Sequence, residues 1–170
     1  MNLKDKIRVI PDFPSPGIRF KDITTLLQDG EAYQEAVNQM IAFAKDKGAD
    51  IIAGPESRGF MFAGPMAFAM GKGFVPVRKP GKLPHETISM DYALEYGKDS
   101  LEIHTDAVKP GQKVIIADDL LATGGTIGST VKLFEKLGAE VVGVVFLIEL
   151  TYLNGREKLE GYDVLSLVQY

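Results

Sequence analysis

The chain has 170 residues, a formal net charge of −4 at pH 7 and no cysteine. Without cysteine it forms no disulfide, thiolate zinc site or iron–sulfur cluster, and its acidic balance gives no basic footprint for nucleic acid. Its length fits one domain. The most apolar stretch, residues 59–70, is shorter than the ~20 residues of a membrane span, and Pro65 interrupts it. We therefore expect a buried helix there, no membrane partner and a cytoplasmic protein without a signal peptide.

The first part of the chain predicts two helices separated by turns. Residues 2–10 are compatible with a short helix that ends before Pro11. Residues 11–17 must form turns, because proline fixes its own φ and restricts the residue before it. Residues 31–47 carry apolar side chains at helical spacing, and Gly48 is a plausible end for that helix.

From residue 50 onward, short apolar strands alternate with helices. We expect strands at 50–54, 74–78, 113–117, 140–148 and 163–168, helices at 59–70 and 125–137, and a polar hairpin at 88–104. This alternation indicates an α/β fold with a mainly parallel, twisted sheet that helices cover on both faces. In such sheets ligands bind beyond the carboxyl ends of the strands, so the residues that follow the strands are the candidates for a site.

The segment after strand 113–117 combines two carboxylates with a glycine turn. Residues 122–126, Ala-Thr-Gly-Gly-Thr, stand directly before a predicted helix, where free amide groups suit a phosphate monoester. Asp118 and Asp119 would repel each other and a phosphate, unless ribose hydroxyls or a magnesium ion lie beside them. The segment therefore indicates a ribose 5-phosphate site. An ordinary glycine turn, with one aspartate capping it, is the alternative.

Other familiar sites find little support. The chain has no P-loop motif and no G-x-G-x-x-G after a strand. Its histidines are His85 and His104, which we expect to be surface or hydrogen-bonding residues rather than metal ligands.

Several strings resemble one known family. Residues 114–126, Val-Ile-Ile-Ala-Asp-Asp-Leu-Leu-Ala-Thr-Gly-Gly-Thr, are similar to the phosphoribosyl pyrophosphate (PRPP) motif of type I phosphoribosyltransferases, and further strings match the members of that family that use adenine. These are residues 11–23 (Pro-Asp-Phe-Pro-Ser-Pro-Gly-Ile-Arg-Phe-Lys-Asp-Ile), 56–60 (Glu-Ser-Arg-Gly-Phe), 78–84 (Arg-Lys-Pro-Gly-Lys-Leu-Pro), 94–98 (Leu-Glu-Tyr-Gly-Lys) and 149–150 (Glu-Leu). The resemblance spans nearly the whole chain.

The resemblance implies a fold and a reaction. One phosphoribosyltransferase domain would span residues 1–170, with a small hood at about 1–30 and a mobile flap at about 80–104. It would transfer ribose 5-phosphate from PRPP to adenine, giving AMP and pyrophosphate in purine salvage. Mg²⁺ would be held mainly by PRPP rather than by a metal site of the protein, and the expected assembly is a homodimer without nucleic acid.

The resemblance also assigns roles to residues. The PRPP and AMP phosphate and ribose would be bound by Asp118, Asp119, Ala122, Thr123, Gly124, Gly125 and Thr126, the pyrophosphate by Glu56, Ser57, Arg58, Arg78, Lys79 and Lys82, and adenine by Arg19, Phe20 and Leu150. In the family the bond between residues 56 and 57 is often a cis peptide. Glu95 matches the catalytic glutamate, which takes or delivers a proton at the purine, and Tyr96 would pack over the substrates from the flap.

Elementary charge arguments support part of this assignment. Arg78, Lys79 and Lys82 stand close together after a predicted strand, which is costly unless an anion lies nearby. A solvated basic loop is the alternative. Arg58 carries a guanidinium that can bind two phosphate oxygens at once.

Three other functions stay open at this point. The first is a phosphoribosyltransferase for another purine. The second is a regulator that senses PRPP and binds nucleic acid, although the negative charge speaks against it. The third is a sugar-phosphate-binding module without catalysis.

Overall fold

The computed structural model describes residues 1–93 and 97–170. The predicted catalytic residue Glu95 and the flap residue Tyr96 lie outside the described residues.

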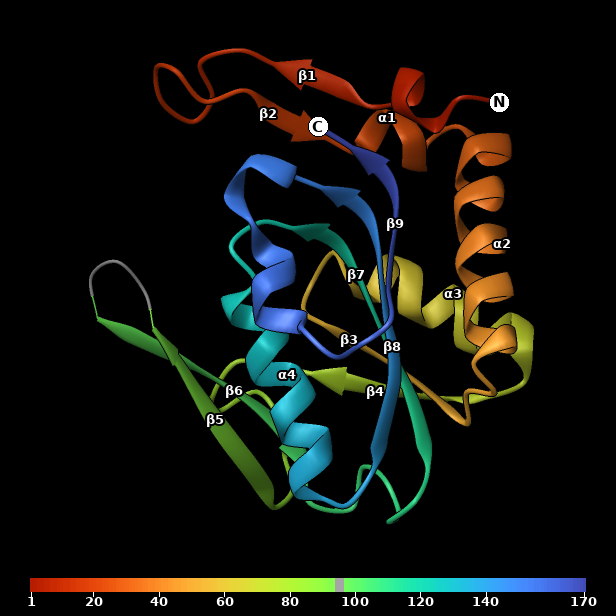
Figure 1. The fold of residues 1–170 in the computed structure, drawn as a ribbon, viewed down its shortest axis with the longest axis vertical. Helices are drawn as coiled ribbons and strands as arrows, with labels where there is room; N and C mark the ends of the chain where they lie inside the picture. The colour runs from red at the N-terminus through yellow and green to blue at the C-terminus, as the bar shows by residue number, and fades with distance from the viewer. Residues whose placement is uncertain (94–96) are drawn as a thin grey trace.

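A five-stranded sheet forms the centre of the fold (Figure 1). Its strand order is β4-β3-β7-β8-β9, and every neighbouring pair is parallel. The strands are β3 (Ile51–Pro55), β4 (Gly73–Val77), β7 (Lys113–Leu121), β8 (Glu140–Glu149) and β9 (Val164–Gln169). This confirms the predicted parallel sheet, whose strands are continuously apolar because both faces are covered.

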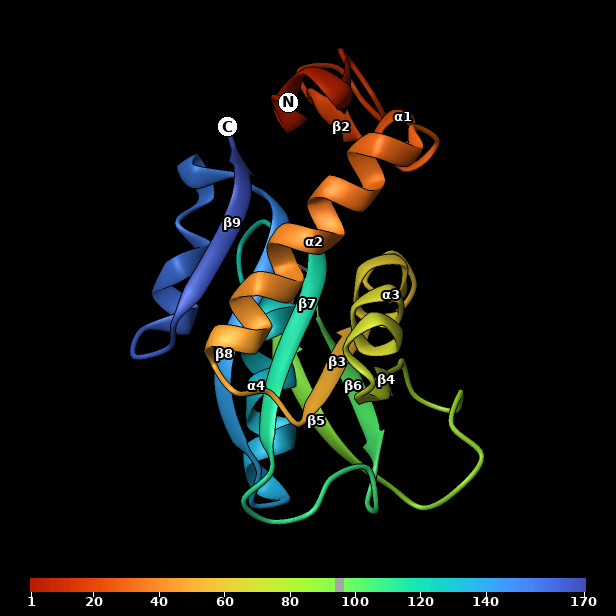
Figure 2. The ribbon, with the colours of Figure 1, turned by 90° about the vertical axis from the view of Figure 1, so that its right-hand side faces the viewer.

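Helices cover the two faces of the sheet (Figures 1 and 2). One face packs against α2 (Gly30–Asp46) and α3 (Phe60–Met70), and the other packs against α4 (Gly125–Lys136). Alternate residues of β7 divide between the two faces: Ile115 belongs to the core under α2 and α3, and Ile116 to the core under α4. This is the alternation that a strand's geometry imposes.

The helix α3 is buried on one side only. Phe62 and Met66 are fully buried, as the apolar run predicts, but Phe68 is 90% exposed. No helix among residues 1–93 and 97–170 combines the length and the apolar character needed to cross a bilayer.

Two small antiparallel units lie outside the sheet. Near the N-terminus, η1 (Leu3–Lys6) leads into β1 (Arg8–Ile10), which pairs with β2 (Phe20–Asp22) before α1 (Thr24–Leu27). The predicted helix at 2–10 is therefore wrong beyond Lys6, because residues 8–10 pair with β2.

The predicted hairpin is confirmed as β5 (Thr87–Ala93) and β6 (Lys98–His104). The short helices η2 (Thr151–Leu153) and η3 (Gly155–Leu159) connect β8 to β9.

The strand β7 is longer than predicted. It runs to Leu121 rather than to residue 117, because its pairing with β8 continues as far as Glu149. Asp118 and Asp119 are therefore consecutive residues near the carboxyl end of this strand.

Close packing between β3 and α3 gives a test of the core. A methyl group on Gly54 would lie 2.8 Å from the Cβ of Ala63 and 3.0 Å from the carbonyl oxygen of Ala117. We therefore expect Gly54→Ala to lower the free energy of unfolding by about 1–3 kcal/mol. The matched control is Gly64→Ala on α3, whose added methyl group would meet nothing within 4 Å. It should instead raise the free energy by up to about 1 kcal/mol through helix propensity.

Urea unfolding followed by circular dichroism, at one protein concentration, measures both changes. A wild-type midpoint for Gly54→Ala would contradict the packing argument.

Candidate active site

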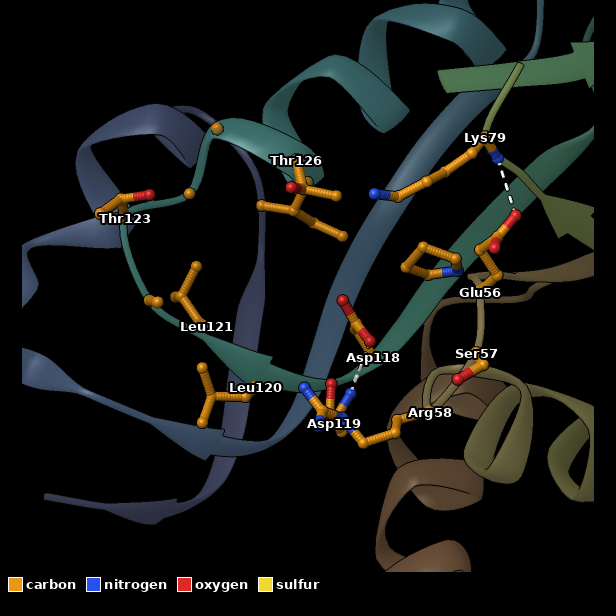
Figure 3. A pocket seen from close by; sticks show the side chains of 15 residues that line it. Glu56, Ser57, Arg58, Lys79, Asp118, Asp119, Leu120, Leu121, Thr123 and Thr126 are labelled. Atoms are coloured by element: carbon orange, nitrogen blue, oxygen red, sulfur yellow. Dashed lines mark hydrogen bonds and ion pairs between the residues drawn. The ribbon is translucent and has the colours of Figure 1, made fainter. Parts of the chain in front are cut away.

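A cavity of about 450 Å³ opens at the carboxyl ends of β3 and β7 (Figure 3). Its walls are residues 55–58 after β3, Lys79 after β4, and residues 118–127, which run from β7 into α4. The glycine turn and the two carboxylates that the sequence singled out therefore line one cavity, at the sheet edge where a ligand was expected.

The turn at residues 122–126 is shaped by backbone contacts. Gly124 has φ +87°, a left-handed conformation that favours glycine, and a methyl group there would lie 2.6 Å from the carbonyl oxygen of Gly155. Gly155 in turn packs against the carbonyl oxygen of Ala122 and the side chain of Leu121. Gly155 was not predicted to shape this turn, although Asn154 and Gly155 together make an Asn-Gly turn signal.

The helix α4 begins at this turn with its amide groups available. No side chain of the described residues caps its N-terminus, where Gly124 is the N-cap residue. The first amide groups of a helix lack partners within the helix and carry its positive dipole end. Together with the side chains of Thr123 and Thr126, which also line the cavity, they suit a phosphate group.

The two carboxylates differ in their partners. Asp119 is 8% exposed, and its Oδ2 lies 2.8 Å from Nε of Arg58. The Oδ1 of Asp118 accepts a hydrogen bond of 2.8 Å from the amide of Asp119. Burial, followed by the neighbouring charge of Asp119, raises the pKa of Asp118 well above its usual range. Asp118 is thus an acceptor whose charge is poorly compensated in the protein alone.

The turn after β3 is tied to the loop after β4. The peptide bond between Glu56 and Ser57 is cis, as the resemblance implied. The Oε1 of Glu56 accepts hydrogen bonds from Nε of Arg78, at 3.2 Å, and from the amide of Lys79, at 2.8 Å. The Glu56 carboxylate therefore holds residues 78–79 against the turn.

The structure distributes the predicted cations unevenly. Arg58 and Lys79 line the cavity, with exposed fractions of 55% and 53% for their side chains, and Nζ of Lys79 lies 3.3 Å from Oδ2 of Asp99 on β6. Arg78 and Lys82 do not line it: the Arg78 guanidinium faces Glu56, and Lys82 is exposed in the loop that follows.

A second cavity of about 340 Å³ adjoins the first and shares Arg58, Asp119 and Leu120 with it. Arg19 and Phe20 contribute from the β2 side, and Leu150 from the end of β8. The three residues predicted to bind adenine therefore lie around one space, although residues 20 and 150 are distant in the chain. Ile18, which belongs to the turn at residues 17–20, also lines this cavity, as does Tyr152, which was not predicted.

Comparison with known proteins identifies the fold and the family. Residues 24–167 match the model of the phosphoribosyl transferase domain. The chain is 63% identical over 170 residues to an adenine phosphoribosyltransferase of Clostridium perfringens, covering all of this chain and 99% of that protein. It is 61% identical to an adenine phosphoribosyltransferase of Brevibacillus brevis over the full length of both.

Solved structures agree with this assignment. The crystal structure of adenine phosphoribosyltransferase from Thermoanaerobacter pseudethanolicus superposes with a TM-score of 0.94 at 56% identity, covering 99% of this chain and 98% of that one. The yeast enzyme, from Saccharomyces cerevisiae, was crystallised with an imino-altritol bisphosphate and adenine, and it superposes with a TM-score of 0.92 at 40% identity over 97% of this chain and 96% of that one. Because of these matches, and because its motifs meet at one site, the chain belongs to the phosphoribosyltransferase family.

Proposed function

We infer that this protein is an adenine phosphoribosyltransferase, which transfers ribose 5-phosphate from PRPP to adenine in purine salvage and releases pyrophosphate with AMP. The observation that carries this inference is the pair of adjoining cavities. One is lined by amides, carboxylates and cations, and the other by the apolar side chains of Phe20 and Leu150. The first suits a phosphorylated sugar and the second a flat base, and the relatives named above share the activity.

The donor would be held by the first cavity. The amides at the start of α4 and the hydroxyls of Thr123 and Thr126 would bind the 5-phosphate. Asp118 and Asp119 would accept hydrogen bonds from the 2′ and 3′ hydroxyls of the ribose. Arg58 and Lys79 would bind the pyrophosphate, Arg58 through the part of its guanidinium that Asp119 does not engage. Arg78 and Lys82 are proposed for the same anion, Arg78 acting from behind Glu56.

Charge development explains how this arrangement promotes the reaction. When the bond from the anomeric carbon to pyrophosphate breaks, the ribose gains positive charge and the leaving group gains negative charge. The carboxylates of Asp118 and Asp119 lie at the cavity wall proposed for the ribose, and Arg58 and Lys79 at the wall proposed for the pyrophosphate. Groups fixed in this way stabilise the separated charges without reorganising during the reaction.

Selection of adenine would depend on the second cavity. The ring would lie between Phe20 and Leu150, and backbone carbonyls of residues 17–20, Arg19 among them, would accept a hydrogen bond from the exocyclic amine. Hypoxanthine presents a carbonyl oxygen at that position, so two acceptors would face each other. A buried polar mismatch of this kind can discriminate strongly between bases.

Proton transfer is proposed for Glu95. Its role rests on the resemblance, as does the packing of Tyr96 over the substrates, since both residues lie outside the described part of the chain. They follow β5, whose Ala93 and Tyr92 line a cavity beside Thr123 and Gly125. The hairpin thus leads toward the phosphate turn.

Mg²⁺ is proposed to arrive with PRPP. No group of three or more His, Cys, Asp or Glu side chains gathers within the described ranges. Mg²⁺ usually keeps several waters and takes one or two carboxylates plus substrate phosphates, which fits a cavity whose acidic neighbours are Asp118 and Asp119. When bound, the ion would neutralise charge on the pyrophosphate.

A homodimer and a cytoplasmic location are further proposals. The outer side of α3 exposes Phe68 and Met61, and Phe74 on the edge strand β4 is 37% exposed and packs edge-to-face on Phe60. Exposed large apolar side chains on neighbouring elements favour contact with a second copy of the chain. The substrates, PRPP and adenine, are metabolites of the cell interior.

The central experiment offers the protein several bases. Purified protein is mixed with PRPP, Mg²⁺ and adenine, hypoxanthine or guanine, and the nucleotide formed is quantified by chromatography. We expect AMP from adenine and at least about a hundredfold lower rate with the other purines. Turnover with hypoxanthine but not adenine would identify a different purine enzyme. PRPP binding without turnover of any base would indicate a sensor or a binding module.

The role of Glu95 is tested by Glu95→Ala. Positioned proton transfer contributes about 10²–10⁴-fold to a rate, so we expect kcat to fall at least tenfold. PRPP binding, measured by calorimetry, should stay near the wild-type value. The control is Glu86→Ala, which removes an exposed carboxylate at the base of the same hairpin. Equal rates for the two variants would remove Glu95 from this role.

The raised pKa of Asp118 predicts opposite effects on stability and binding. The folded protein disfavours the ionised side chain, so its contribution to stability is present below the unfolded pKa, near 3.9, and is lost as the pH rises through the folded pKa. Asp118→Asn should therefore unfold like the wild type near pH 4. At pH 8 it should be more stable, by roughly 1–2 kcal/mol.

The same variant should bind PRPP at least about tenfold more weakly, because a neutral amide is a poorer acceptor for the ribose hydroxyls. Asp106→Asn, which changes an exposed aspartate, is the control and should alter neither quantity. Thermal unfolding at several pH values and PRPP calorimetry measure the two effects. A stability gap that does not grow with pH would contradict the assignment.

A further inference from the structure

Tyr170, the residue that follows β9, contacts the neighbours of residues at both walls of the second cavity without lining it. One wall is Leu150, at the end of β8. The other is formed by Arg19 and Phe20, where the chain enters β2. Figures 1 and 2 show the end of β9 at the same end of the molecule as η1, β2 and α1, and β9 contacts η1.

The backbone of Tyr170 brackets Leu150. Its amide donates to the carbonyl oxygen of Glu149 at 3.0 Å, and its carbonyl oxygen accepts from the amide of Thr151 at 2.9 Å. The hydroxyl of Thr151 donates to the same carbonyl oxygen at 2.7 Å. The residues on both sides of Leu150 are thus hydrogen-bonded to Tyr170, which fixes the backbone position of Leu150 at the wall of the second cavity.

The side chain of Tyr170 contacts the opposite wall. Nζ of Lys21 lies 4.6 Å from the centre of the Tyr170 ring, within the range of a cation–π contact. The same ammonium donates to the carbonyl oxygen of Arg19 at 2.9 Å. Burial, then the charges of Arg19 and Lys4, lower the pKa of Lys21, so its ammonium is partly removed from water, where a cation–π contact is stronger.

The ring, not the hydroxyl, makes this connection. The Tyr170 hydroxyl is buried and has no hydrogen-bond partner among the described residues. Lys4 also lies over the ring, at 4.5 Å from its centre, and donates to the carbonyl oxygen of Gln169 on β9 at 2.8 Å. Lys4 is not among the residues that line the second cavity. Lys21 alone of the two ammonium groups therefore links the ring to that cavity.

We propose that Tyr170 is a positioning residue that sets the spacing between the two walls of the base cavity, through its backbone at Leu150 and through its ring at Lys21. This proposal rests on the proposed function only in taking the second cavity as the base site. Loss of the ring leaves the backbone bonds to Glu149 and Thr151 intact and releases the β2 wall alone. The consequence is weaker binding of the base, with the PRPP site unchanged.

Steady-state kinetics of matched variants test this role. We expect Tyr170→Leu to raise KM for adenine by about five- to twentyfold, with KM for PRPP within about twofold of wild type. Tyr170→Phe, which keeps the ring and removes the unpaired hydroxyl, should resemble the wild type. Lys21→Met should raise KM for adenine, and its combination with Tyr170→Leu should be no worse than the more impaired single variant.

The control is Lys4→Met, which removes the other cation from the same ring and should leave KM for adenine within about twofold of wild type. Equal increases of the KM values for adenine and PRPP would overturn the proposal, because they would indicate that the whole fold is destabilised. Additive effects of Tyr170→Leu and Lys21→Met would also overturn it, because they would indicate that the two residues act independently.

A second measurement needs no substrate and survives failure of the proposed function. Hydrogen exchange of wild type and Tyr170→Leu should differ at the amides of β2 and remain alike at the amide of Thr151, whose bond to residue 170 is retained. If the wild type fails to use adenine, the proposed function is wrong, but the exchange measurement still tests the link between Tyr170 and β2. Unchanged exchange at the β2 amides in Tyr170→Leu would overturn that link.

Discussion

The site depends on the ion pair between Arg58 and Asp119. Two consecutive carboxylates in a strand are unfavourable unless their charges are compensated, and the 2.8 Å contact to Arg58 compensates one of them. The pair also joins the turn after β3 to the strand β7. Because Arg58 and Asp119 line both cavities, it stands at their junction. Asp118 forms no ion pair among residues 1–93 and 97–170, and burial followed by the charge of Asp119 raises its pKa.

The hydrogen bonds of Glu56 compensate charge at another wall of the first cavity. Its carboxylate orders the backbone of Lys79 and the guanidinium of Arg78 without occupying the cavity. The positively charged side chains of Arg78 and Lys79, which would otherwise repel each other, are thereby kept close together near the proposed anion site. The cations at this wall are therefore paired with carboxylates of the protein, Arg78 with Glu56 and Lys79 with Asp99.

Much of this architecture was predictable from local patterns. Runs such as residues 113–117 and 140–148 are continuously apolar, so they indicate buried parallel strands without further information. The turn at 122–126 was predictable from its adjacent glycines before a helix. The end of β7 was not, because Asp118 and Asp119 are poor strand residues that pairing with β8 keeps extended. The strand β1 was also missed, because residues 8–10 are extended only through their pairing with β2.

The choice of partners among charged side chains was also beyond the sequence. Arg58 and Arg78 carry the same guanidinium group, yet Arg58 pairs with Asp119 and lines the cavity, whereas Arg78 pairs with Glu56 and does not line it. Only the folded chain decides which carboxylate each one meets. Tyr170 and Gly155 were not predicted because they lie outside the motifs and contact them only in the folded chain.

The contact between Gly155 and the turn at 122–126 has a consequence for how a ligand is received. The carbonyl oxygens of Gly155 and Ala122 occupy the space that a side chain on Gly124 or Gly155 would need, so the backbone of η3 packs closely on the turn. The amides of the turn are therefore already ordered before an anion arrives, and association there forfeits little conformational entropy. Because little of the phosphate binding free energy is spent on ordering this turn, more of it remains to position the rest of the ligand.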